Sequence, residues 1–368
     1  MPDSRIRDTI LAISTANEAN FNDMTLLAAN MSTLVTRSTG IPAPVLEKFD
    51  DKGVVGNYPN GEFASLQRSG FVIPPAFEIS NVVSAEMFFK QVRRFLGLAD
   101  PVPAAGDIIE AGIAFKHHGK MLPNNTAAGL QLPSSTFAFS NNGLDYLYAG
   151  CCGNTLQIQQ QGGADPTYAI GYVGSGLYKR IRDVSGPVFG TLAAPAAQNY
   201  MLGPETQVEF TDDSGLLSLT TAHRLRNITI NVQNNLRTDL RLAGASPVDP
   251  TDLKKGWYLD SLTHGDRDAG ATMRIALDDT LREFFDANND TDITNFTMRM
   301  RGYKIPTTAS NSRYTVEVIF GKCHFNGQQV TDDGGDAALD INITPCSDGS
   351  NFGIVKVDAI NGVATAIA

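Results

Sequence analysis

The chain has 368 residues, and its 39 Asp and Glu outnumber its 29 Lys and Arg to give a formal net charge of -10. This acidic balance argues against a surface that grips nucleic acid, because phosphate binding depends on clustered Lys and Arg. No stretch approaches the roughly 20 apolar residues that cross a bilayer, and the start (MPDSRIRDTILAIS) lacks the apolar core of a secretory leader, so no membrane partner is expected.

Residues 1–60 are predicted to form an N-terminal arm. Ile10 to Thr36 carries apolar side chains at irregular helical spacing, which favours a helix there. Pro42 and Pro44, followed by several glycines, then break this pattern into a loop.

Residues 61–190 are predicted to form a first β-rich region around one short helix. Ser84 to Leu96 (SAEMFFKQVRRFL) has an apolar stripe at helical spacing, with Ser84 as a candidate N-cap and Gly97 at its end. Asn142-Gly143 and Gly162-Gly163 suit hairpin turns. The extended segments expected in this region are Ser69 to Ile79, Ile113 to His117, Ser135 to Phe139 and Thr155 to Gln159.

A Pro- and Ala-rich linker is expected over Gly186 to Asn199, before a second β-rich region over residues 200–368. The clearest pattern in this region is Asn227 to Leu236 (NITINVQNNL), where apolar and polar residues alternate as in a strand with one wet face. The run ends in Asn234-Asn235, residues that tolerate turn geometry. The other predicted elements are a helix over Leu277 to Phe285 and strands over Leu216 to Thr221, Phe296 to Tyr303, Tyr314 to Phe320 and Leu339 to Thr344.

Two stretches resemble metal sites, and neither completes one. The run Asp286 to Asp292 (DANNDTD) opens like a calcium loop, but Thr291 replaces the glycine of the sharp turn and Thr297 replaces the bidentate Glu. His117 and His118 are adjacent, so in a strand they point to opposite faces, and no third ligand lies at a telling spacing. We therefore predict no metal site.

Catalytic and cofactor signals are equally weak. Gly171 to Gly176 is glycine-rich but lacks both common nucleotide-binding patterns. Ser175 has no evident His and Asp partners. The sequence predicts no catalytic residue, no cofactor and no enzymatic activity. The four cysteines, which we expect to be reduced thiols in a cytoplasmic setting, are Cys151, Cys152, Cys323 and Cys346.

Three strand motifs follow one another along the chain: LPSSTFAF (Leu132 to Phe139), YLYAGCCGNTLQI (Tyr146 to Ile158) and RNITINVQNNL (Arg226 to Leu236). They are followed by KGWYL (Lys255 to Leu259). This order is similar to that in tail tube proteins, the major tail proteins of long-tailed bacteriophages. The resemblance covers roughly Gly112 to Ile343, and the N-terminal region departs from it.

The resemblance implies a mainly β fold: a β-sandwich or incomplete barrel tail-tube fold with short flanking helices, present either once or as two tandem tube-like domains. It also implies homo-hexameric rings, or trimeric rings if each chain holds two tube domains, stacked into a conduit for DNA ejection. The expected partners are other copies of the chain, tail proteins at the tube ends, and tape measure protein and then DNA in the lumen. The expected location is the virion tail, after synthesis in the host cytoplasm.

An acidic lumen would repel DNA phosphates, and long polar loops such as Asp51 to Gly61 and Ala243 to Gly256 would join rings. The strands predicted to form the ring are Asn227 to Gln233 and Phe296 to Tyr303. Their candidate residues are Ile228, Ile230, Val232, Phe296, Met298 and Met300.

Two alternatives remain at the level of sequence. Another virion ring component, such as a tail terminator, neck or minor capsid protein, would have the same composition but would not stack into long tubes. A carbohydrate-binding β-sandwich is the third interpretation, and Trp257 with scattered tyrosines gives it slight support.

Overall fold

The computed structural model is built mainly of antiparallel β-strands, and the α-helix whose bounds it describes is α1 (Met87–Leu96). This confirms the predicted mainly β, sandwich-like fold class. The residues that the structure describes are 10–25, 30–37, 44–51, 66–97, 103–121, 132–140, 145–180, 192, 198–212, 218–219, 225–239, 258–277, 279, 282, 293–306, 311–346 and 353–365.

The first sheet contains seven strands, each antiparallel to the next. In spatial order they are β5 (Ala76–Val82), β10 (Thr167–Val173), β9 (Tyr146–Gln161), β14 (Leu225–Gln233), β15 (Asp268–Ala276), β19 (Asp336–Cys346) and β18 (Lys322–Asp333).

The second sheet is also antiparallel throughout. A two-residue strand, β13 (Ser218–Leu219), pairs with the end of β12, and the pair Ile293 and Cys323 joins this sheet to the first. Its main strands, in spatial order, are β12 (Met201–Asp212), β16 (Ile293–Lys304), β17 (Arg313–Phe320), β20 (Lys356–Asn361), β7 (Ala114–Lys120) and β6 (Ile108–Glu110).

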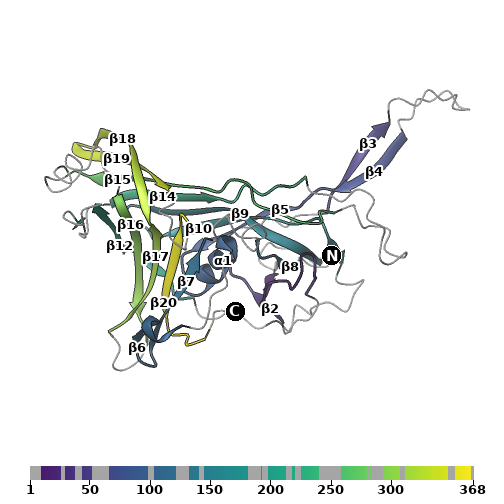
Figure 1. Ribbon diagram of the computed structural model, residues 1–368, viewed down its shortest axis with the longest axis horizontal. Coiled ribbons are helices and arrows are strands. Elements are labelled where there is room, and N and C mark those ends of the chain that lie inside the picture. Colours follow the sequence, from purple (N-terminus) through teal and green to yellow (C-terminus); the bar gives the residue numbers. More distant parts are fainter. Residues whose placement is uncertain are drawn as a thin grey trace, which may run out of the picture.

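The two sheets bury one common core. Figure 1 shows β5, β9 and β14 running across the picture and β16, β17 and β20 running down it, with α1 in the angle between them. Side chains alternate between core and solvent along strands such as β10, β14 and β15, as the pleat requires. Core residues such as Ile79, Ile230, Met298 and Val318 therefore meet in a single buried cluster although they come from distant segments.

Helix α1 is confirmed close to its predicted bounds. Gly97 ends it in the left-handed conformation, with φ of 103°, and its N–H donates to the carbonyl of Arg93. The N-cap position is held by Glu86 rather than Ser84, so that detail was wrong by two residues. Ser84 still lies at the helix start, where its Oγ accepts from the N–H of Phe88 at 3.4 Å.

The helix predicted over Ile10 to Thr36 is wrong, because strands form there. β1 (Ile10–Ser14) pairs with β2 (Met31–Thr33) and with β8 (Ser135–Ser140). β8 in turn pairs with the first half of β9, whose other side meets β11 (Tyr178–Arg180). Irregular helical spacing is a weak local signal, and pairing with a β8 strand buried along most of its length overrides it.

Strands β3 (Leu46–Asp51) and β4 (Leu66–Val72) form a separate two-stranded sheet. Figure 1 shows this hairpin extending away from the rest of the described chain. At its base, the N–H of Ile73 donates to the carbonyl of Val45 at 2.8 Å, and both side chains are exposed.

Two predicted turns are confirmed. Gly162-Gly163 joins β9 to β10, and Asn235, just after β14, adopts φ of 47°. Asn142-Gly143, the calcium-like loop and Trp257 lie outside the described residues. So do most of the predicted linker over 186–199, most of the helix over 277–285 and most of the strand over 216–221.

The stretches 61–190 and 200–368 share both sheets. β9 from the first stretch pairs with β14 from the second over seven residue pairs, from Asn227 with Gln161 to Gln233 with Thr155. β7 likewise pairs with β20. The division of the chain into an arm and two domains stays a prediction.

Candidate functional site

The six residues predicted for ring formation all lie in the common core. Each is at most 1% exposed and belongs to the same cluster; they are Ile228, Ile230, Val232, Phe296, Met298 and Met300. Their strands are interior ones: β14 lies between β9 and β15, and β16 lies between β12 and β17. These side chains therefore pack the sandwich of one copy, and their part in ring formation stays a prediction.

The outer face of the second sheet carries a row of ionised side chains, which we call the charged row. Four of its members stand directly opposite one another on neighbouring strands: Arg299 on β16, Glu317 on β17, Asp358 on β20 and His118 on β7. Cross-strand neighbours of this kind lie about 4.5–5.5 Å apart at Cβ, so alternating charge stabilises the row and like charge would not.

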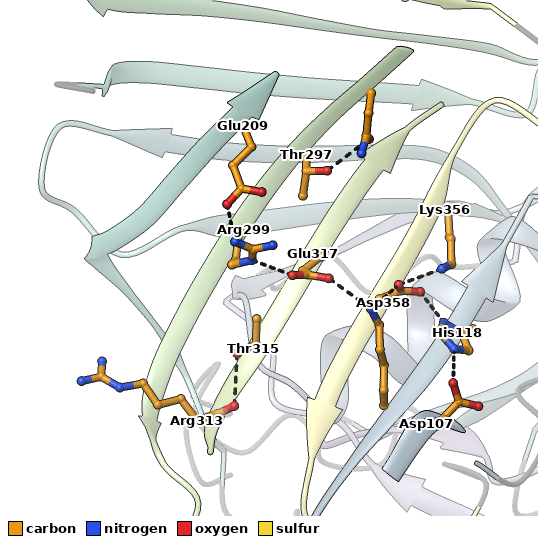
Figure 2. A network of polar contacts seen from close by, with 12 residues as sticks. Asp107, His118, Glu209, Thr297, Arg299, Arg313, Thr315, Glu317, Lys356 and Asp358 are labelled. Atoms are coloured by element: carbon orange, nitrogen blue, oxygen red, sulfur yellow. Dashed lines mark hydrogen bonds and ion pairs between the residues drawn. The ribbon is translucent and has the colours of Figure 1, made fainter. Parts of the chain in front are cut away.

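Lys116 neutralises the one contact between like charges in the charged row. Glu317 and Asp358 are both acidic, and the Nζ of Lys116 lies 3.4 Å from Glu317 Oε2 and 3.0 Å from Asp358 Oδ2. At the other end, the Nε of Arg299 donates to Glu317 Oε1 at 2.6 Å and its Nη1 pairs with Glu209. Figure 2 shows these contacts crossing the sheet from β12 to β20.

Asp358 is the most buried member, with its side chain 1% exposed. Its Oδ2 also meets Lys356 Nζ at 2.8 Å and its Oδ1 meets His118 Nδ1 at 2.6 Å. Burial alone would raise the pKa of Asp358, but the hydrogen bonds from His118 and Lys356 and the charge of Lys116 outweigh it, so the pKa is lowered.

His118 lies between two carboxylates. Its Nε2 is 2.8 Å from Asp107 Oδ1, at the end of the short 3-10 helix η3 (Ala105–Asp107), while its Nδ1 faces Asp358. The hydrogen bond with Asp358 is the main cause that raises the pKa of His118, and the one with Asp107 adds to it. The doubly protonated ring can donate to both carboxylates at once.

With His118 protonated, the charged row is electrically balanced. The row then holds four cations and four anions. The cations are Arg299, Lys116, Lys356 and His118, and the anions are Glu209, Glu317, Asp358 and Asp107. Such a row holds five strands in register, and it leaves its basic groups already paired with acids rather than available to an outside phosphate.

The outer face of the first sheet is polar but mostly uncharged in its centre. Gln157 on β9 donates from Nε2 to Asn231 Oδ1 on β14 at 3.0 Å. A shallow hollow near the β5 edge is lined by Arg37, Ser80 and Gln159, among others. Other outward residues on β9 and β14 are Thr155, Gln161, Asn227, Thr229 and Gln233.

Sequence reasoning missed the charged row because its members come from six segments spread between residues 107 and 358. A local signal existed in the alternating Lys116, His118 and Lys120 of β7 and in Arg299 and Arg301 of β16. This alternation shows that the charges share a face, but only the sheet order shows which charges meet.

The other residues singled out from the sequence are His117 and the four cysteines. His117 is buried beside Phe89 and its Nε2 lies 3.0 Å from the carbonyl of Val363, on the opposite face from His118 as predicted. Within the described ranges, no group of three or more His, Cys, Asp or Glu is placed to hold a metal. The four cysteines are free thiols, and burial raises the pKa of the three that are buried.

A scan against protein-family models gives no match, and a search of curated proteins gives none. Among solved structures, the chain is similar to the SPP1 tail tube, determined by solid-state NMR and cryo-electron microscopy, with 12% sequence identity and a TM-score of 0.27. The likeness covers 44% of this chain and 80% of that chain. At this TM-score it carries no argument about function. Among the described residues, no helix is long and apolar enough to cross a membrane.

Proposed function

We propose that this chain is a structural virion protein that assembles into stacked rings and forms the tail tube of a long-tailed phage. The observation that carries the proposal is the β3–β4 hairpin, a ribbon paired only with itself among the described residues and extended away from the sandwich (Figure 1). An isolated two-stranded hairpin is marginally stable in water, so it needs packing from elsewhere. A neighbouring copy in the next ring supplies that packing.

The motifs from Leu132 to Leu236 support the same proposal, because their order is similar to that in tail tube proteins. They fall on β8, β9 and β14, three strands that meet through β9. The role we propose is therefore to build a wall rather than to catalyse a reaction.

The surface chemistry also suits a conduit for DNA. The centre of the first sheet's outer face offers amides and hydroxyls, while the charged row on the second sheet's outer face pairs its own cations with acids (Figure 2). Neither arrangement offers the free basic cluster that would hold phosphate by releasing counterions. DNA, and tape measure protein before it, would then pass without being retained.

The test is negative-stain electron microscopy of the purified chain at increasing concentration. We expect hollow tubes of uniform width, whose rotational symmetry distinguishes hexameric from trimeric rings. Single rings that never stack would instead support a terminator or neck protein, and persistent monomers would contradict the proposal.

A hairpin variant tests the observation that carries the proposal. Replacing residues 47–71 by a short Gly-Ser linker should leave the sandwich folded by circular dichroism and should abolish stacking. The matched control replaces the tip residues Gly334 and Gly335 of the β18–β19 turn by Asn-Gly, which keeps a two-residue turn with positive φ. Tubes of normal length from the hairpin variant would remove the hairpin as support.

A further inference from the structure

The two sheets differ in the relative direction of their edge strands, and this difference indicates which sheet a second copy can extend. This inference rests on the proposed assembly into rings. In a ring, neighbouring copies are related by rotation, so each strand keeps its direction along the ring axis from copy to copy. One edge of a sheet then meets the opposite edge of the same sheet in the next copy.

The second sheet has edges of opposite direction. The pairings β12–β16, β16–β17, β17–β20, β20–β7 and β7–β6 are all antiparallel. These five reversals leave β6 running opposite to β12. Strand β12 of the next copy can therefore join β6 as one more antiparallel neighbour, and the alternation continues without a break.

The first sheet has edges of the same direction. Six antiparallel pairings lead from β5 through β10, β9, β14, β15 and β19 to β18. A junction between β18 and the next copy's β5 would place one parallel pair in an antiparallel sheet. Parallel pairing is slightly less stable per residue, and purely antiparallel sheets are over-represented relative to random expectation.

The edges of the first sheet are also obstructed within the chain. On the β5 edge, the carbonyl of Ser80 accepts from the N–H of Arg37 at 2.7 Å, and Asn81 Nδ2 donates to the carbonyl of Val35 at 2.9 Å. On the β18 edge, Cys323 is already paired with Ile293 of β16. A segment that covers or pairs with an edge strand prevents that edge from pairing with another copy.

The edges of the second sheet are open in the part of the chain that the structure describes. β6 pairs there with β7 alone and exposes two consecutive isoleucines, Ile108 at 43% and Ile109 at 50%. On the far side of β12, β13 reaches only Phe210 and Thr211, so the described strands leave residues 205–209 uncovered. Apolar side chains on an open edge promote aggregation of a monomer, and they stabilise an interface when a partner covers them.

We infer that the ring closes through the second sheet, by antiparallel pairing of β6 in one copy with β12 in the next. Ile109 and Gln207 then lie at the same junction. Gln207 stands opposite Arg299 and so faces outward, and Ile109, which lies at the register shift between Ile108 and Glu110, is 50% exposed.

Disulfide trapping tests this junction in the assembled protein. The double variant Ile109→Cys with Gln207→Cys should give a ladder of covalent oligomers, up to the full ring, when assembled tubes are oxidised. The control pair Ala76→Cys with Val330→Cys marks the edges of the first sheet and should give no ladder. Oxidised wild type reports any background from the half-buried Cys346.

The outcomes separate the two proposals. A ladder from the 109–207 pair supports the junction. Tubes that form normally but give a ladder only from the 76–330 pair, or from neither pair, overturn the junction and leave the tube proposal standing. Failure of every variant and of wild type to form rings overturns both.

A second pair of variants tests the edge without new thiols. Ile109→Lys places a charge on the open edge and should reduce ring formation at least about tenfold, because a lysine on an edge strand opposes pairing with another strand. Val330→Lys, on the exposed edge of the first sheet, should assemble as wild type does. Both variants should keep the wild-type circular dichroism spectrum, and normal assembly by a folded Ile109→Lys protein would overturn the junction.

Discussion

Glu18 shows how one buried carboxylate fixes the N-terminal segment onto the sandwich. It accepts from Ser134 Oγ and Thr136 Oγ1 at 2.7 Å each and from the N–H of Gly150 at 3.1 Å. Burial raises the pKa of Glu18, and these hydrogen bonds lower it only in part. One of the donors that hold the Glu18 carboxylate is therefore the backbone N–H of Gly150, whose φ of 63° lies in the left-handed region.

Gly150→Ala should destabilise the fold by about 1–3 kcal/mol, because a Cβ strains the positive φ and meets the Asn22 and Ser175 side chains. Gly163→Ala is the matched control, since nothing lies within 4 Å of a Cβ at that position. It should change stability by less than about 0.5 kcal/mol. Urea unfolding measures both, and equal effects would contradict the close approach at Gly150.

The charged row predicts a pH dependence of stability. The folded pKa of His118 is raised above its ordinary 6.5, so its contribution is fully present below that value and is lost as the pH rises through the folded pKa. The folded pKa values of Asp107 and Asp358 are lowered. Their contribution is present above the ordinary carboxylate range and is lost as the pH falls.

His118→Gln should cost about 1–2 kcal/mol near pH 6, where the ring donates to two carboxylates, and clearly less at alkaline pH. The quantity to measure is the difference in unfolding free energy between wild type and the His118→Gln variant at each pH. Burial lowers the pKa of Lys90 to about 8, which makes wild-type stability rise over the same alkaline range. A difference in unfolding free energy that stays constant from pH 6 to pH 9 would exclude a protonated His118 in the row.

At the scale of elements, α1 is tied to β1 by Arg94, a buried cation that has no acidic partner among the described residues. Arg94 donates from Nη2 to the carbonyls of Ser14 and Thr15 at 2.8 and 2.9 Å, and from Nη1 to Ser135 Oγ at 3.1 Å. Burial lowers the pKa of Arg94 to about 10. The guanidinium supplies the donors that these buried oxygens need, so helix and strand form one unit.

Arg94→Met should destabilise the protein by about 2–4 kcal/mol, because it leaves buried carbonyls without a donor. Lys90→Met on the same helix is the control: it removes one bond, to Ser32 Oγ at 2.9 Å, together with a buried charge. Its effect should stay within about 1 kcal/mol. Thermal unfolding compares the two, and the reverse ranking would show that Arg94 is not the link.

The same elements show the limits of local sequence signals. The alternation of β14 and the stripe of α1 were strong enough to predict both elements closely, whereas Ile10 to Thr36 was assigned to a helix although it forms β1 and β2. The difference is physical: β14 and α1 carry complete periodic patterns, while β1 takes its conformation from β8, which follows it by more than a hundred residues.

At the scale of the whole molecule, the shared core predicts a single cooperative unfolding transition. Ile230 on the first sheet and Met298 on the second belong to one cluster. Ile230→Ala and Met298→Ala should each cost about 2–5 kcal/mol and shift the whole transition. Differential scanning calorimetry separates this from two independent domains, in which each variant would move only one of two transitions.

The sequence by itself determined that the protein is mainly β, which faces of its best strands are apolar, and where α1 ends. These features depend on side-chain periodicity and on single residues such as Gly97, which act locally. Only the tertiary structure decided that Ile228 and Met298 point into one common core, that Arg299, Glu317, Asp358 and His118 form one row, and that β14 and β16 are interior strands. Strand order and register come from pairing between distant segments, and periodicity within one segment carries no information about its partner.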